Sequence, residues 1–253
     1  MSIRKAHLER LKKEGYNPRE IKAIQNGTSQ NAVAQVKSIR DQIRKDPKLL
    51  KQFKDRLFCY RRAEEHLWTK DRAFIDYDYL FKRILNEPLS VFLVRMGQEK
   101  KKLKVLDEGA GLGVFLLDLK ELLAKDGIDT ETTAVVLKKH NLLETYHKDG
   151  KIDNVYVGTS EFFLPDKKYD VIFSLYGGMH YTQPEFRKNL LIKYAFALNR
   201  GGVALIGADF IGIRTPLFEQ MRTAFRKRGF EITCKEVQAS GQHPTDIVMI
   251  RRL

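Results

Sequence analysis

The segment Asp107-Glu108-Gly109-Ala110-Gly111-Leu112-Gly113 places glycines at every second position directly after two acidic residues. It follows the apolar run 103–106 and precedes leucines at helical spacing, which predicts a strand, a tight turn and a helix. Glycine lets the backbone turn sharply and lets a ligand approach the main chain closely. The first amides of the following helix point at the same place. The segment is therefore a candidate ligand-binding turn.

Two other interpretations of this turn are open. A dinucleotide-binding turn has the form G-x-G-x-x-G/A, in which the third small residue lets helix and strand pack closely. Counted from Gly109 and Gly111, that third position is Val114, which does not fit. A turn whose glycines serve packing alone is the second alternative.

The observed pattern, D-x-G-x-G-x-G, resembles the first motif of the class I S-adenosylmethionine-dependent methyltransferases, and the resemblance extends over about residues 103–253. It implies that the acid and the glycines line the pocket for the methionine and ribose parts of the cofactor. The matching positions, with the alanine between them, are Asp107, Gly109, Ala110, Gly111 and Gly113.

Further segments resemble the same family in order and spacing. Residues 169–174, Tyr-Asp-Val-Ile-Phe-Ser, are similar to its fourth-strand motif and place Ser174 at the polar end. Residues 197–203 are similar to its turn before the fifth strand, with Arg200 where proline is usual. Two closing strands separated by a short loop around Ser240-Gly241-Gln242 predict an antiparallel hairpin, because so short a loop leaves no room for a parallel crossover.

Two departures from the family pattern concern the ribose and adenine contacts. Where the family often ends its second strand with an acid, this chain has Leu137 or Lys138. Where the family often has Gly-Asp after the third strand, this chain has glycine followed by Thr159 and Ser160. A hydroxyl or a backbone group at these positions can still serve. A nucleic-acid-binding protein with an inactive methyltransferase-like domain is therefore the alternative function.

The residues after the fourth predicted strand, 175–181, are Leu-Tyr-Gly-Gly-Met-His-Tyr, and they carry the candidate chemistry. His180 is a candidate general base for a hydroxyl or an amine, since an unperturbed histidine titrates near neutral pH. Tyr176 and Tyr181 are candidates for shaping a substrate pocket. Packing is the alternative role for all three. The signatures of amino-directed nucleic-acid, cytosine C5 and ribose 2′-O methylation are absent from the corresponding positions.

These residues require a sheet that brings the ends of several strands together. Short apolar runs alternate with helical patterns after Lys101, which predicts a doubly wound α/β domain over residues 101–253 with a mostly parallel, seven-stranded sheet. The predicted strands are 103–106, 132–137, 155–157, 169–175, 203–206, 230–237 and 245–250. Helices are predicted over 184–198 and 217–228.

Residues 1–100 are predicted to form a basic helical region. They hold 23 lysines and arginines against 13 acids, a net charge of +10, whereas residues 101–253 hold 23 against 19, a net of +4. We expect this region to cap the site or to recruit a substrate such as RNA. Residues 17–40 resemble a helix-turn-helix with Gln30, Asn31, Gln35 and Lys37 exposed, although two ordinary amphipathic helices explain them as well.

The composition limits the class of protein. Hydrophobic residues make up 43% of the chain, so a folded core is expected, and no apolar run approaches a membrane span. The two cysteines, Cys59 and Cys234, indicate neither a disulfide framework nor a metal site, and the cytoplasm is the expected location. The sequence thus predicts a methyltransferase that uses S-adenosylmethionine, with a small molecule as first acceptor and RNA as second.

Overall fold

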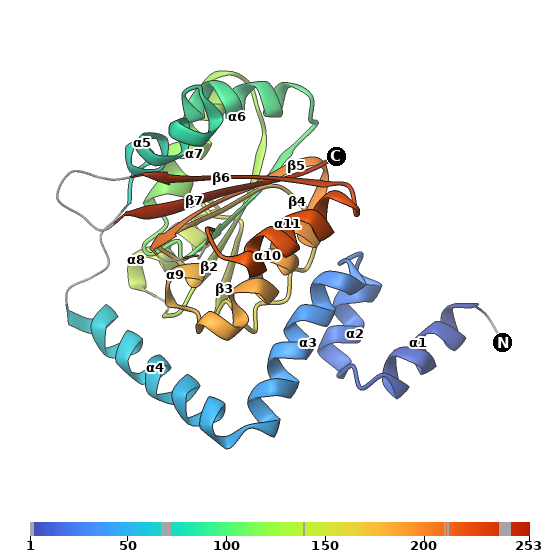
Figure 1. Cartoon of the computed structure of the whole chain (residues 1–253). Helices are drawn as coiled ribbons and strands as arrows, with labels where there is room; N and C mark the ends of the chain where they lie inside the picture. The colour runs from blue at the N-terminus through green and yellow to red at the C-terminus, as the bar shows by residue number, and fades with distance from the viewer. Residues whose placement is uncertain (1–2, 67–71, 139, 210, 212, 238–243) are drawn as a thin grey trace.

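One seven-stranded sheet forms the centre of the molecule (Figure 1). The computed structural model describes residues 3–66, 72–138, 140–209, 211, 213–237 and 244–253. The strands are β1 (Leu103–Glu108), β2 (Thr130–Val136), β3 (Asn154–Val157), β4 (Tyr169–Leu175), β5 (Leu198–Asp209), β6 (Phe230–Val237) and β7 (Thr245–Arg252). Their order is β3-β2-β1-β4-β5-β7-β6, and only β7 runs against the other six.

The strand pattern confirms the predicted fold class. All seven residues of β4 are buried, because helices cover both faces of the sheet. The closing hairpin is confirmed, since β6 and β7 pair antiparallel from Phe230 opposite Arg252 to Val237 opposite Thr245. The loop predicted around residues 240–242 lies outside the described residues. Strand β5 begins at Leu198, earlier than expected.

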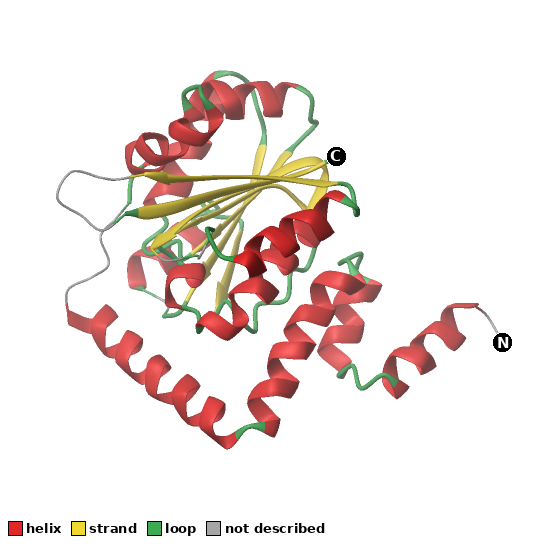
Figure 2. Ribbon diagram, in the orientation of Figure 1, coloured by secondary structure: helices red, strands yellow, loops and turns green. Residues whose placement is uncertain are grey.

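Helices form a layer on each face of the sheet (Figure 2). One face is covered by α5 (Phe74–Leu85), α6 (Leu89–Gln98), α7 (Val114–Lys125) and α8 (Asn141–Lys148). The other is covered by α9 (Gly178–Tyr181), α10 (Pro184–Ala197) and α11 (Pro216–Arg226). The remaining helices are α1 (Ile3–Lys13), α2 (Pro18–Gln25), α3 (Gln30–Lys45) and α4 (Pro47–His66).

The described part of the first hundred residues is mainly helical, as predicted, and it contributes to both hydrophobic cores. Ile39 and Phe53 belong to the cluster that contains Leu190 of α10, whereas Tyr77 and Phe81 belong to the cluster on the opposite face. Figure 1 shows α3 lying beside α10. The apolar residues of both parts are therefore buried together. A domain boundary near residue 100 stays a prediction.

The helix-turn-helix interpretation of α2 and α3 needs a correction. The two helices and the turn between them form as predicted, but α3 packs against α10. The Asn189 amide of α10 donates to the Gln35 side chain at 3.0 Å, so the expectation that Gln35 lies on a free helix face is wrong. Lys37 is also engaged, since its ammonium pairs with Asp41 at 2.8 Å.

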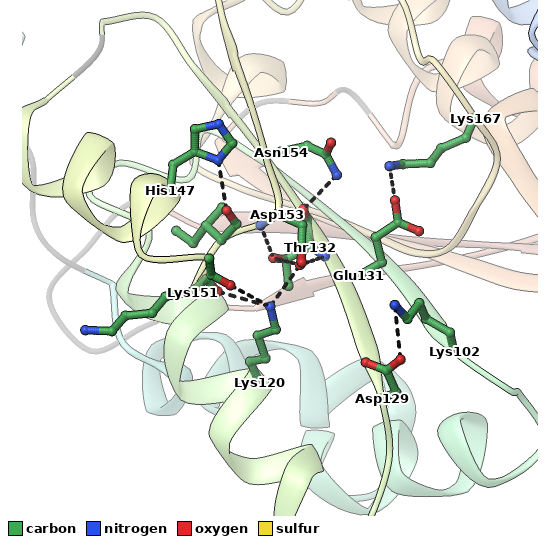
Figure 3. A network of polar contacts seen from close by, with 12 residues as sticks. Lys102, Lys120, Asp129, Glu131, Thr132, His147, Lys151, Asp153, Asn154 and Lys167 are labelled. Atoms are coloured by element: carbon green, nitrogen blue, oxygen red, sulfur yellow. Dashed lines mark hydrogen bonds and ion pairs between the residues drawn. The ribbon is translucent and has the colours of Figure 1, made fainter.

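A polar network connects β2, α7 and the start of β3 (Figure 3). One carboxylate oxygen of Asp153 accepts hydrogen bonds from the backbone amide and the hydroxyl of Thr132, each at 2.8 Å. The same oxygen accepts from the Lys120 ammonium of α7 at 3.0 Å. These contacts hold the short edge strand β3 in register beside β2, because Asp153 immediately precedes it.

The described residues contain no candidate metal centre of three or more ligating side chains. None of their helices combines the length and the apolarity that crossing a bilayer requires. Cys59 is exposed and Cys234 is half-buried, and both are free thiols.

Candidate functional site

A pocket of about 350 Å³ opens at the carboxyl ends of β1, β2 and β4, where ligands bind in open α/β sheets. Strands that run in the same direction end at one edge of the sheet, so the loops that follow them meet there. Ten of the residues that the sequence singled out line this pocket. They are Gly109, Ala110, Gly111, Leu137, Lys138, Thr159, Ser160, Tyr176, His180 and Tyr181.

Three other predicted site residues, Asp107, Gly113 and Ser174, do not line the pocket and are buried behind its wall. The Ser174 hydroxyl donates to the Glu108 carboxylate at 3.1 Å, so it helps to position Glu108, which is buried behind the pocket lining. A Cβ on Gly113 would come within 2.5 Å of the Ile152 side chain, so this glycine is explained by packing of the turn against the segment before β3.

The glycines of the turn have different reasons to be glycine. A Cβ on Gly109 would lie 2.4 Å from the Gly177 Cα, so the loops after β1 and β4 touch main chain to main chain. Gly111 has a φ of +56° and no atom within 4 Å of where its Cβ would be. Since Gly111 lines the pocket, its open side is where a ligand can meet the backbone.

Asp107 is fully buried beneath Tyr77, which comes from α5. The Tyr77 hydroxyl lies 3.0 Å from each carboxylate oxygen of Asp107, and its ring stacks on Phe115 of α7 at 3.6 Å between centroids. Burial raises the pKa of Asp107 to about 7, although the Tyr77 hydrogen bond and the Arg72 charge oppose the shift. This carboxyl group therefore changes its charge near neutral pH.

The loop after β4 holds His180 between two aromatic rings. The His180 ring meets Tyr181 edge-on at 4.9 Å and Tyr176 at 5.7 Å between centroids. Tyr176 adopts a left-handed backbone with φ +47°, which is uncommon for a residue with a Cβ. Its hydroxyl lies in hydrogen-bond contact with Thr245 and its ring lies under the Arg72 guanidinium, so neighbouring elements hold the turn in place.

Several lining residues come from the amino-terminal region, where the sequence indicated an aromatic cluster containing Tyr77 as a possible cap but did not single out Arg72 or the residues of α4. Phe53, Arg56 and Leu57 line the pocket from α4, and Arg72 and Tyr77 line it from the segment before the sheet. The spacing of residues 53, 56 and 57 places them on one helix face, and this can be deduced from the sequence. The sequence does not tell which pocket this face meets. Val135, Val136, His140, Gly158, Glu161, Gly177 and Gly178 complete the lining.

A buried charged cluster lies under the pocket wall. The Lys193 side chain of α10 has no exposed surface, and its ammonium donates to the backbone carbonyl of Ser160 and lies 4.0 Å from the Glu108 carboxylate. Tyr194 donates to the other oxygen of Glu108. Burial lowers the pKa of Lys193, while the nearby Glu108 carboxylate opposes that shift. The cluster connects α10 to the end of β1 and to the loop that contributes Ser160.

Known structures share this architecture. A protein from Listeria monocytogenes, assigned to the class I S-adenosylmethionine-dependent methyltransferases, matches with a TM-score of 0.50 and 12% identity, over 74% of this chain and 71% of its own. A Burkholderia thailandensis 1,6-didemethyltoxoflavin N1-methyltransferase matches at 0.47 with 16% identity, over 76% of this chain and 83% of its own. No family model matches the sequence, and no curated protein matches it significantly. The chain has the fold of the class I S-adenosylmethionine-dependent methyltransferases.

Proposed function

We propose that this protein is an S-adenosylmethionine-dependent methyltransferase that methylates an O or N atom of a small molecule. The observation that carries the proposal is the open side of Gly111, which faces a pocket at the carboxyl ends of the strands. Gly109 and Gly113 have neighbouring atoms at this position, whereas Gly111 combines open space with a place in the pocket lining. The shared fold supports the same interpretation.

The lining residues fit the parts of this cofactor. The backbone at Ala110 and Gly111 would hold the amino acid and ribose, and Leu137 and Lys138 at the end of β2 would meet the ribose from the other side. Thr159 and Ser160 would meet the adenine through hydroxyl or backbone groups. Ser174 acts indirectly in this proposal, since it supports Glu108 below the wall.

Charged groups near the glycine turn suit the methionine end. Arg72 donates to the backbone carbonyls of Leu175 and Tyr176, which leaves guanidinium donors for a carboxylate. Asp107, reached through the Tyr77 hydroxyl, would favour a nearby ammonium group when it is ionised.

Bound S-adenosylmethionine supplies a methyl group on a positively charged sulfur, which an acceptor displaces in line. The protein then has to orient the acceptor and exclude water. Tyr176 and Tyr181 flank His180 and would orient its ring. His180 would accept the proton that the acceptor loses.

Replacing Gly111 with leucine tests the proposed cofactor site. The side chain would enter the pocket, and we expect calorimetry to show no binding of S-adenosylhomocysteine. Gly127 gives a matched control, because it also has a positive φ, +70°, and no neighbour near its Cβ, yet it lies outside the pocket. Both substitutions should cost about 1–2 kcal/mol of stability from backbone strain. Only Gly111→Leu should lose binding.

Equal binding by the parent and a folded Gly111→Leu variant would show that the assigned site is wrong. Absence of binding by the parent protein would favour the alternative, an inactive methyltransferase-like protein. His180→Ala should keep the affinity for S-adenosylhomocysteine and lose roughly two to four orders of magnitude in methyl transfer. An unchanged transfer rate would leave His180 a packing residue.

A further inference from the structure

Helix α4 turns one face toward the pocket, and that face alternates apolar and cationic side chains. Phe53, Arg56 and Leu57 follow each other at helical spacing and all line the pocket. Phe53 is buried and meets Phe162 edge-on at 5.3 Å, which fixes its ring. Arg56 donates from one guanidinium nitrogen to the Tyr181 carbonyl at 3.0 Å. The helix therefore presents a guanidinium between two apolar groups, beside the loop that carries His180.

The charges that line the pocket are unbalanced. Among the described residues, Arg56 donates only to the Tyr181 carbonyl and has no carboxylate partner. Arg72 donates to two backbone carbonyls, contacts the Tyr77 hydroxyl and lies near the Asp107 carboxylate. The one acidic side chain in the lining, Glu161, is buried and accepts from the Thr182 hydroxyl at 2.7 Å. Burial raises the pKa of Glu161, which favours its neutral form. Because the proposed cofactor has a net positive charge, its carboxylate can compensate only one of the two arginines.

The two arginines serve different ends of the pocket. Arg72 lies over the ring of Tyr176 and is close enough to buried Asp107 to affect its ionisation, so it belongs to the methionine end. Arg56 donates to the Tyr181 carbonyl. It lines the pocket together with Phe53 and Leu57 of the same helix. Its remaining donors form a planar fork of the kind that binds a carboxylate through two parallel hydrogen bonds.

We propose that the methyl acceptor is a small carboxylic acid with an apolar body, whose carboxylate binds Arg56 while its body packs against Phe53 and Leu57. The role of this acid as methyl acceptor rests on the proposed function, whereas the binding of an acid at Arg56 does not. In this proposal the carboxylate anchors the acid to Arg56. The methylated atom is another atom of the acid, on the side toward His180.

The position of the charge favours a small acid over RNA. An RNA substrate would bring an uncharged base into the pocket and keep its phosphates outside. Arg56 is half-buried in the pocket wall, where it would meet that base and have no anion to pair with. A small acid bound in the pocket beside the cofactor places its charge on the guanidinium.

The experiment compares acids with their uncharged amides on the full chain saturated with S-adenosylhomocysteine. The probes are phenylacetate, 3-phenylpropionate, indole-3-acetate and octanoate, each paired with its primary amide, measured by calorimetry. We expect at least one acid to bind at least tenfold more tightly than its amide, about 1.4 kcal/mol. Arg56→Met should remove this preference because it keeps an apolar stem without the charge. Lys54→Met, on the exposed side of the same helix, should keep it.

The outcomes separate this inference from the proposed function. If no acid is preferred over its amide, or if Arg56→Met retains the preference, the acid subsite is wrong. If an RNA oligonucleotide displaces the bound acid and loses affinity in Arg56→Met, the pocket serves RNA and the inference is overturned. If the parent fails to bind S-adenosylhomocysteine, the proposed function fails. The ratio of acid to amide affinity, measured in the absence of S-adenosylhomocysteine, still tests whether Arg56 binds a carboxylate. Arg56→Lys, which keeps the charge without the fork, gives an intermediate ratio and covers the case in which Arg56→Met does not fold.

Discussion

Asp107 combines complete burial with a single hydroxyl partner, so its ionisation couples to folding. A carboxyl group whose folded pKa is raised to about 7, from 3.8, binds its proton more tightly in the folded chain. The folded state holds more protons than the unfolded state between these values, so stability falls as pH rises from about 4 to about 7. The loss reaches at most roughly 1.4 kcal/mol per pH unit in that window and stops above it.

Asp107→Asn should remove this pH dependence, because the amide has the same shape and does not titrate. We expect the difference in unfolding free energy between variant and parent to shift in favour of the variant from pH 4 to pH 7. Urea unfolding at several pH values measures it. Asp126→Asn, at the exposed carboxyl end of α7, is the control and should follow the parent at every pH. A pH-independent difference for Asp107→Asn would contradict the assigned ionisation.

The same turn illustrates what the sequence could and could not predict about single residues. The spacing of Asp107 and the glycines predicted a ligand-binding turn, part of which lines the pocket, because the pattern depends on local backbone geometry. It could not tell that Gly109 is required by Gly177, that Gly113 is required by Ile152, and that of the three only Gly111 has open space where its Cβ would be. Those contacts join residues far apart in the chain, and no local pattern records them.

Helix α10 positions one wall of the pocket through a buried cation. Lys193 donates to the Ser160 carbonyl and lies 4.0 Å from the Glu108 carboxylate, which favours its charged form. Glu108 in turn accepts from Ser174 of β4 and Tyr194 of α10. The end of β1, the loop after β3 and α10 therefore share one polar network beneath the pocket.

Lys193→Met should destabilise the protein by about 3–5 kcal/mol, because Glu108 would remain buried without its cation. It should also weaken S-adenosylhomocysteine binding, since the Ser160 loop would lose its anchor. Urea unfolding and calorimetry measure the two effects. Adding Glu108→Gln should recover part of the stability, and Lys188→Met on the exposed side of α10 should leave both quantities unchanged. No loss of stability in the single variant would exclude the proposed role of the cluster.

Element boundaries were predictable where periodicity is strong and less so where tertiary contacts decide. The buried run 169–175 became β4 with the same bounds. Helices α5 and α6 are separated at Pro88, because proline disfavours the helical conformation of the residue before it. The pocket face of α4 was not foreseen, because helical spacing defines a face without naming its partner.

At the scale of the whole molecule, the amino-terminal helices are bound into the fold by a shared core. Ile39 of α3 is fully buried in the cluster that holds Leu190 and Tyr194 of α10. The Thr28 hydroxyl donates to the Pro165 carbonyl and connects the turn before α3 to the loop before β4. The basic charge thus belongs to a segment that packs on the methyltransferase fold, which leaves less of its surface for RNA.

Ile39→Ala should lower the unfolding free energy by about 2–5 kcal/mol and keep a single unfolding transition. Hydrogen exchange should speed up in α10 as well as in α3, since both lose the same packing. Arg44→Ala, at an exposed position of α3, should change neither. Faster exchange confined to α3, or a second unfolding transition, would indicate an independent amino-terminal domain.

The contribution of α4 to the pocket also has a consequence for how the range of bound ligands can change over time. The side chains at positions 53, 56 and 57 belong to a helix that precedes the sheet, whereas the glycine turn belongs to its centre. Exchanges on that short face alter which molecules fit without touching the main-chain contact between Gly109 and Gly177. A lineage that carries this arrangement can change which ligands fit the pocket through a few substitutions in one helix, while the glycine turn stays intact.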